Sequence, residues 1–224
     1  MKQLVYLGLF VVIFISITAC PREKNNADTQ KLEQLENLLS LQPEAVLDSL
    51  RQINPRLLND YNKAYYQLIE VIAKDKTFFH FTSDSLINSA VAVLSTRRSK
   101  HPNNYARALM YQGIVRYRMG VTDSTAFLPL KKAIDIFEKQ PIADKKNIYL
   151  SYLYAGQIHD TYNNVDEVHY YFTEALKYVK MNKDTSQFNY IYTELAWNRL
   201  KANEPKEAKK YIDLFKKLRF NARR

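Results

Sequence analysis

The stretch that decides the fold is Tyr149–Tyr178, YLSYLYAGQIHDTYNNVDEVHYYFTEALKY. On both sides of the polar turn at 162–164, apolar residues recur at the three- and four-residue spacing of an amphipathic helix. The stretch therefore predicts two antiparallel helices joined by a tight turn.

Residues of matching size recur at one spacing before and after this hairpin. Within it, the spacing is set by Gly156, Val168, Phe172 and Ala175, which follow one another after twelve, four and three positions. The same spacing holds, with one extra residue in the earlier turn, for Gly113, Ala126, Leu130 and Ala133 and for Ala196, Ala208, Ile212 and Phe215. We expect the small residue to let the second helix of each hairpin cross the first closely, and the others to let the next hairpin stack.

The composition favours an all-α domain built from such hairpins. Apolar residues make up 46% of the 224 residues, and four glycines are too few for the turns of an all-β domain of this length. Helix spacing and end signals predict further helices over 32–39, 43–53, 57–74, 86–94, 105–119, 124–137, 188–201 and 205–219. The aromatic segment 77–82 is expected to pack against them as an ordered loop.

The repeated spacing resembles the tetratricopeptide repeat. The residues that carry the likeness are Gly113, Tyr117, Gly120, Ala126, Ala133, Gly156, Phe172, Ala175, Ala196 and Ala208. The repeat departs from the standard one, since it is 43 and then 40 residues long rather than about 34, and Tyr152 and Tyr192 replace the tryptophan of the first helix. Residues 30–178 look similar to a group of tetratricopeptide-repeat lipoproteins of Bacteroides-type bacteria. The resemblance implies a right-handed solenoid of antiparallel helical hairpins that serves as a lipid-anchored protein-interaction module of the envelope.

The N-terminus has the pattern of a lipoprotein leader. An almost unbroken apolar run over 4–19 ends at Ile17-Thr18-Ala19-Cys20, which resembles a bacterial lipobox, and Cys20 is the only cysteine of the chain. We expect a signal peptide at 1–19, diacylglycerol and palmitate on Cys20, a flexible tether at 20–29 and the helical-repeat domain at 30–224. The protein would then be anchored through this lipid in the cell envelope, at the outer membrane rather than the inner one. The alternative is an uncleaved anchor or plain secretion, with a cysteine there by chance.

A binding groove is expected on the inner face of the first helices of the hairpins. By the repeat spacing, its residues are Lys63, Tyr66, Glu70, Lys74, Arg107, Met110, Tyr117, Arg118, Gln157, Asp160, Tyr190, Trp197 and Lys201. This mixture of aromatic and basic side chains suits a protein or peptide segment of some acidic character. A solvated helix face without a ligand remains the alternative. Another alternative function is an accessory lipoprotein for glycan binding or uptake, with Tyr190 and Trp197 as the sugar platform.

Other chemistry finds little support in the sequence. There is no nucleotide-binding glycine loop, serine-hydrolase motif or zinc motif, so we expect no enzyme activity, no metal and no cofactor. The net charge of +10 is concentrated in residues 206–224, where eight basic residues stand against two acidic ones. This basic tail could be a solvated capping helix or contact anionic headgroups or envelope polymer. Nucleic acid is disfavoured as a partner, because the leader directs the chain out of the cytoplasm.

Overall fold

The computed structural model describes residues 21–141, 144–182 and 187–221, and within these ranges the regular structure is entirely helical. The helices are α2 (Pro21–Leu38), α3 (Pro43–Arg51), the short 3₁₀ helix η1 (Pro55–Leu57), α4 (Asp60–Lys76), α5 (Ser85–Thr96), α6 (Pro102–Arg118), α7 (Ser124–Glu138), α8 (Lys145–Asp160), α9 (Val165–Asn182), α10 (Phe188–Lys201) and α11 (Pro205–Asn221). The predicted all-α class is confirmed. No helix of the described ranges is both long enough and apolar enough to span a bilayer.

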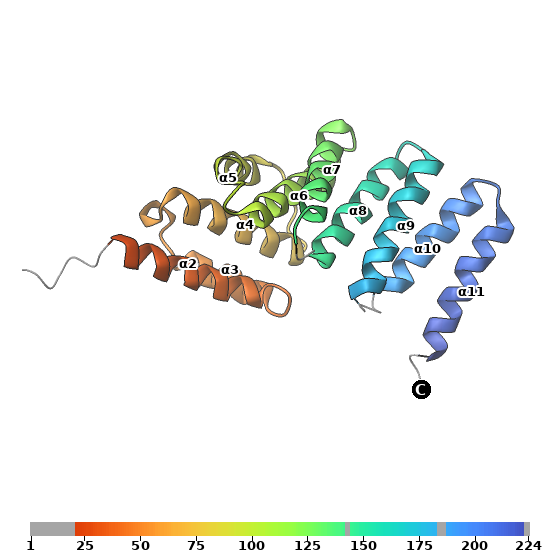
Figure 1. Cartoon of the computed structure of the whole chain (residues 1–224), viewed down its shortest axis with the longest axis horizontal. Coiled ribbons are helices and arrows are strands. Elements are labelled where there is room, and N and C mark those ends of the chain that lie inside the picture. Colours follow the sequence, from red (N-terminus) through yellow and green to blue (C-terminus); the bar gives the residue numbers. More distant parts are fainter. Residues whose placement is uncertain (1–20, 142–143, 183–186, 222–224) are drawn as a thin grey trace, which may run out of the picture.

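The helices pack in the order of the chain, as a row of hairpins (Figure 1). The hairpins α4/α5, α6/α7, α8/α9 and α10/α11 each pack on the next, while α2 and α3 pack against α4. The backbones of α4 and α6 and of α6 and α8 also contact each other directly. We call the side of the array formed by α4, α6, α8 and α10 the A-helix face. This sequential stacking is that of a helical-repeat solenoid.

The small residues of the repeat lie where the two helices of a hairpin cross. A Cβ atom added to Gly156 would lie 2.7 Å from the ring of Phe172 in α9. At Gly113 an added Cβ would lie 2.6 Å from Cγ of Leu130 and 2.7 Å from the carbonyl oxygen of Ala126. The predicted role of these glycines is therefore confirmed, because neither crossing leaves room for a methyl group.

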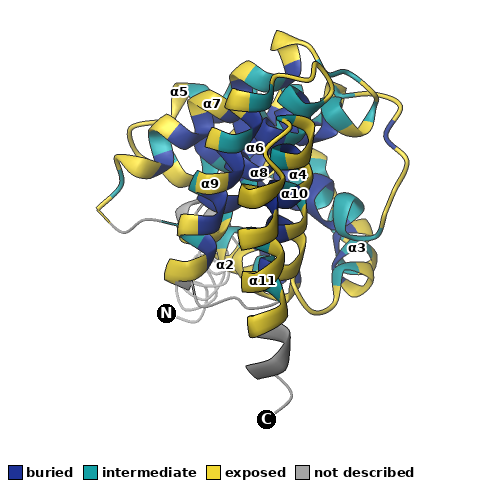
Figure 2. Ribbon diagram, turned by 90° about the vertical axis from the view of Figure 1, so that its right-hand side faces the viewer, coloured by how far each residue is buried: buried dark blue, intermediate teal, exposed yellow. Residues whose placement is uncertain are grey.

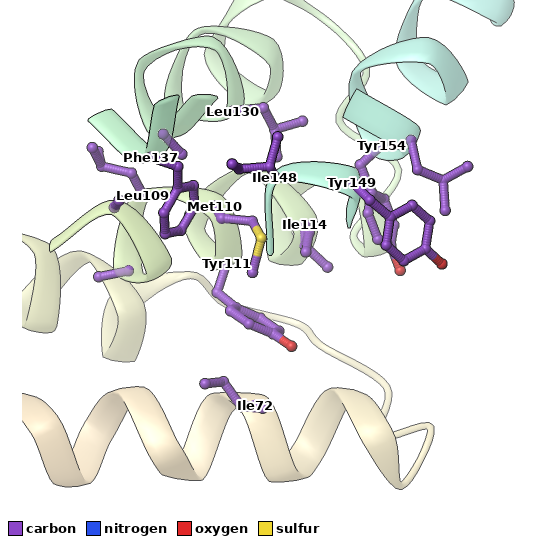
Figure 3. Close-up of a cluster of buried hydrophobic side chains, with 14 of the residues drawn as sticks. Ile72, Leu109, Met110, Tyr111, Ile114, Leu130, Phe137, Ile148, Tyr149 and Tyr154 are labelled. Carbon is purple, nitrogen blue, oxygen red and sulfur yellow. The ribbon is translucent and has the colours of Figure 1, made fainter. Parts of the chain in front are cut away.

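The core runs between the helices along the whole array. Buried side chains come from every α-helix from α2 to α11, and α11 is exposed along most of its length (Figure 2). In the middle of the array, Met110 and Ile114 of α6 lie among Leu130 and Phe137 of α7 and Ile148 of α8 (Figure 3). Because α4, α6 and α8 are covered by their own partner and by the next hairpin, these three helices are buried on most sides.

The start of α7 is held by side chains rather than by its own backbone alone. Asp123 caps the helix, and its Oδ1 accepts a hydrogen bond of 2.8 Å from the backbone N–H of Thr125. Pro129 has no N–H to donate to the carbonyl of Thr125, four residues earlier. Arg116 of α6 fills this place, since its Nη1 donates to the Thr125 oxygen at 2.7 Å. Gly120 ends α6 with a φ of 84°, the left-handed conformation typical of a helix stop.

One local prediction about the N-terminal half was wrong, and a second is confirmed only in part. Residues 21–29, expected to be a flexible tether, form the first half of α2, and Thr29 donates to the side chain of the buried Asn62 in α4 at 2.9 Å. In the aromatic segment 77–82, Phe81 is buried as expected, but Phe78 is 91% exposed. The predicted signal peptide and Cys20 lie outside the described residues.

Candidate functional site

Arg118 joins three helices of the A-helix face. From α6, its Nε donates to Asp75 of α4 at 3.1 Å and its Nη2 to the phenol oxygen of Tyr154 in α8 at 2.8 Å. Its guanidinium carbon also lies 5.5 Å from the centre of the Tyr154 ring. Burial, and next the negative charge of Asp75, raise the pKa of Tyr154, so the phenol stays neutral. Tyr117 packs edge-on against the same ring at 5.7 Å.

Within the described residues, side chains alone connect α8 to α10 on this face. Gln157 donates from Nε2 to the phenol oxygen of Tyr190 at 2.6 Å. Asp160 accepts from Nζ of Lys201 at 2.6 and 2.8 Å through its two oxygens. Six predicted groove residues therefore gather on one continuous surface. They are Tyr117, Arg118, Gln157, Asp160, Tyr190 and Lys201.

Three predicted groove residues at the N-terminal end are not available to a ligand. Met110 is fully buried in the core, because α7 and α8 cover its side of α6 (Figure 3). Tyr66 is turned to the N-terminal hairpin and donates to the carbonyl of Leu50 at 3.2 Å. Arg107 is largely buried and forms an ion pair with Glu36 of α2. Helices α2 and α3 thus cover the place where the groove was expected to begin.

The remaining predicted residues lie at the edges of the A-helix face. Lys63 is exposed. Glu70 and Lys74 pair with each other at 2.5 Å along α4, and Nζ of Lys74 lies 5.3 Å from the centre of the Phe79 ring. Trp197 lies in a separate groove between α10 and α11.

A basic pocket, which was not predicted, opens where α2, α4, α6 and α8 meet. It has a volume of about 310 Å³ and is lined from α2, α4, α6 and α8. Lys76, at the end of α4, and Lys146, at the start of α8, both line it together with the phenol-bearing Tyr111. Neither lysine belongs to an ion pair in the described part of the chain. Burial, and next the charge of Lys146, lower the pKa of Lys76.

Electrostatically, this pocket favours an anionic group. The ammonium groups of the partly buried Lys76 and the exposed Lys146 repel each other, and a carboxylate placed between them would relieve that repulsion. The neighbouring Arg107 is already neutralised by Glu36, and Asp144 is engaged in capping α8 through the backbone N–H of Asn147 at 3.2 Å. The two lysines are therefore the cations that a ligand would meet. No sequence signal could identify them, because they belong to hairpins far apart in the chain and only the stacking of α4, α6 and α8 brings them together.

Two of the four histidines, His159 and His169, have packing roles. The ring of His159 stacks on Tyr171 at 5.1 Å and meets Phe127 edge-on at 4.7 Å, between α7, α8 and α9. His169 hydrogen-bonds to the hydroxyl of Tyr211 in α11 at 3.0 Å. Among the residues that the structure describes, no three His, Cys, Asp or Glu side chains are grouped to hold a metal ion.

The sequence matches no model of a known protein family, and no curated protein matches it. Among the described residues, the A-helix face carries the accessible rings of Tyr117 and Tyr190, the guanidinium of Arg118 and a basic pocket. Such a surface can bind an extended chain with apolar and acidic side chains.

Proposed function

We propose that the protein is a lipid-anchored scaffold of the bacterial cell envelope, whose A-helix face binds an acidic peptide segment of another envelope protein. The observation that carries the proposal is the basic pocket, which is lined by Lys76 and Lys146, neither of them in an ion pair within the described part of the chain. On the same side of the array lies a tyrosine row formed by the accessible rings of Tyr117 and Tyr190. The proposed fold is a tetratricopeptide-like right-handed solenoid. The repeat spacing supports it, and so do the close crossings at Gly113 and Gly156.

In the proposed complex, an acidic side chain of the peptide enters the basic pocket and lies between the two ammonium groups. Its neighbours along the peptide pack on the tyrosine row, where large rigid rings supply contact area at a small cost in conformational entropy. The pairs Gln157–Tyr190 and Asp160–Lys201 hold α10 against α8 and so fix the far wall of the surface. The anchor at Cys20 would keep the scaffold at the membrane, at the outer membrane rather than the inner one.

A displayed library of unstructured random peptides tests the binding proposal on the chain without its predicted signal peptide. We expect the enriched peptides to carry Asp or Glu next to apolar residues. The double substitution Lys76→Ala/Lys146→Ala should weaken their binding by about tenfold, which corresponds to one lost charge-assisted contact. The control Lys131→Ala/Lys139→Ala removes two exposed lysines of α7 and its C-cap and should change little. Enriched peptides without acidic residues, or equal loss in both variants, would show that the pocket is not the site.

The lipid anchor has its own experiment in a bacterial host. Wild-type chain should carry the mass of the acyl groups and sediment with membranes, whereas Cys20→Ser should keep its leader and lose the lipid. A Cys20→Ser variant of unchanged mature mass that remains on membranes would refute the lipidation.

The structure gives no observation in favour of the glycan alternative. Tyr190 is held by Gln157 on the A-helix face, whereas Trp197 lines the groove between α10 and α11. The two rings lie about two turns apart on one side of α10 and make different contacts, which gives no support to the shared platform that sugar binding was expected to use.

A further inference from the structure

An apolar groove lies at the end of the array, between α10 and α11. It has a volume of about 260 Å³ and is lined by Tyr192, Thr193, Ala196, Trp197, Leu200, Ile212 and Phe215. Two of its large apolar residues are well exposed, since 59% of Trp197 and 44% of Leu200 are accessible to solvent. In the described part of the chain no helix covers this face of α10.

The repeat shows what kind of element such a face receives. Trp197 and Leu200 stand one repeat after Gln157 and Asp160, at the same positions of the next hairpin. Gln157 and Asp160 are the residues of α8 that bond to the following first helix, α10. Trp197 and Leu200 therefore occupy positions that contact a following helix.

The polarity at these positions is the reverse of what a solvated end would need. Inside the array, where the next helix packs on these two positions, they are occupied by the polar Gln157 and Asp160. At the end of the array they are the apolar Trp197 and Leu200, although water meets them there. A capping hairpin would carry polar side chains on this face. The apolar residues are thus suited to being covered.

The flanks of the groove carry the opposite chemistry. On α11, Lys209 and Lys216 lie one turn on either side of Ile212, on the same face of the helix. Their equivalents one repeat earlier are His169, which contacts the next hairpin through Tyr211, and the buried Leu176. The receiving surface of the last hairpin is therefore an apolar strip bordered by lysines.

We propose that this groove binds an acidic amphipathic helix of a partner protein, in the place that the first helix of a further hairpin would take. An apolar ridge of that helix would cover Trp197 and Leu200, and its flanking carboxylates would meet Lys209 and Lys216. A two-fold contact between copies of this chain is disfavoured, because the same lysines would face one another. A flat anionic membrane fits less well, because the apolar residues line a recess. This groove shares no lining residue with the basic pocket, and the inference does not rest on the proposed function.

Trp197 is the only tryptophan of the chain, so its fluorescence reports on this groove directly. The probes are two hydrocarbon-stapled helical peptides without Trp or Tyr, with one identical leucine stripe flanked by Glu in the first and by Lys in the second. The Glu peptide should shift the emission to the blue in a saturable way and bind at least about tenfold more tightly than the Lys peptide. Lys209→Glu/Lys216→Glu should reverse that preference. Leu200→Ala should weaken binding about tenfold, while Leu128→Ala, which trims a comparably exposed leucine of α7, should not.

Several results would overturn the inference. They are no saturable shift with either peptide, equal affinity for both, or equal effects of Leu200→Ala and Leu128→Ala. A blue shift with phosphatidylglycerol vesicles but not with the Glu peptide would assign the groove to a membrane surface instead. The groove would be assigned to a second copy of the chain if sedimentation equilibrium showed a dimer, if Trp197 were buried in that dimer, and if the Glu peptide did not dissociate it.

Discussion

The substitution Gly156→Ala tests the close crossing of α8 and α9. The new Cβ atom would lie 2.7 Å from Cε1 and 2.8 Å from Cδ1 of Phe172, well inside the 3.4 Å at which ordinary contact begins. Phe172 is fully buried, so its ring has little space into which it can move. The two helices must therefore separate, or the ring must leave its preferred rotamer.

Two opposing effects set the size of the change. Overpacking a filled core costs about 1–3 kcal/mol, and replacing a mid-helix glycine by alanine gains about 1 kcal/mol in helix propensity. The free energy of unfolding should therefore fall by about 1 kcal/mol. Gly113→Ala should lower it further, by about 2 kcal/mol, because the backbone oxygen of Ala126 at 2.7 Å cannot rotate away as a side chain can.

Urea unfolding followed by circular dichroism measures both changes, with the m-value as a check that the transition stays two-state. The last hairpin pairs Ala196 with Ile212 at the equivalent positions. Phe172→Ile should therefore relieve the clash, and the double mutant Gly156→Ala/Phe172→Ile should show a favourable coupling of about 1 kcal/mol. A Gly156→Ala variant that is stabilised by about 1 kcal/mol, the propensity gain alone, would refute the close-packing reasoning, and so would strict additivity.

Three further predictions concern single residues. Arg116→Ala should lower the free energy of unfolding by about 2–3 kcal/mol in urea titrations. Arg116→Lys should not restore it, because an ammonium group cannot reach Asp84 and the Thr125 carbonyl together. Full rescue by lysine would contradict this reasoning. Gly120→Ala should cost about 1 kcal/mol in thermal unfolding since its φ is 84°, and Gly120→Asn should cost less; equal losses would speak against backbone strain. Burial lowers the pKa of His159 in the folded chain below its ordinary 6.5. As the pH drops, the unfolded chain therefore takes up the proton before the folded chain does. The free energy of unfolding should fall as the pH drops below 6.5 towards the folded-state pKa. His159→Phe should weaken that fall in urea midpoints measured between about pH 7.5 and 5, and an unchanged slope would exclude His159 as its source.

The stacking of the hairpins could be predicted because it depends on sizes at fixed spacings. Gly113 and Gly156 precede Leu130 and Phe172 by nearly the same number of residues, and the crossing geometry follows directly from that. The cap of α7 is equally local, since Asp123 accepts from the backbone N–H of Thr125, two residues later. Such features depend only on residues within one hairpin, and sequence patterns are most informative over such short distances along the chain.

The errors arose where burial depends on distant parts of the chain. Residues 21–29 are polar and predict no helix of their own, yet α2 extends through them and reaches Asn62 of α4. Phe78 is aromatic but is exposed, because Phe81 takes the place in the core.

The candidate site was predictable in the middle of the array and not at its N-terminal end. Repeat spacing placed Tyr117, Arg118 and Gln157 on one surface, as the contacts show. The same spacing assigned Met110 to the surface, although the next hairpin covers it. The lysines of the basic pocket come from α4 and α8, which are not neighbours in the chain, and only the completed stacking brings them together.

The contact between Arg116 and the start of α7 has a consequence for how the molecule opens. The backbone bond that Pro129 removes within α7 is replaced by one that α6 donates to the carbonyl of Thr125. Fraying of the first turn of α7 therefore also breaks a bond to α6, and the same guanidinium holds Asp84, the N-cap residue of α5. Three consecutive helices are tied into one cooperative opening unit, and their amide hydrogens should exchange together rather than helix by helix.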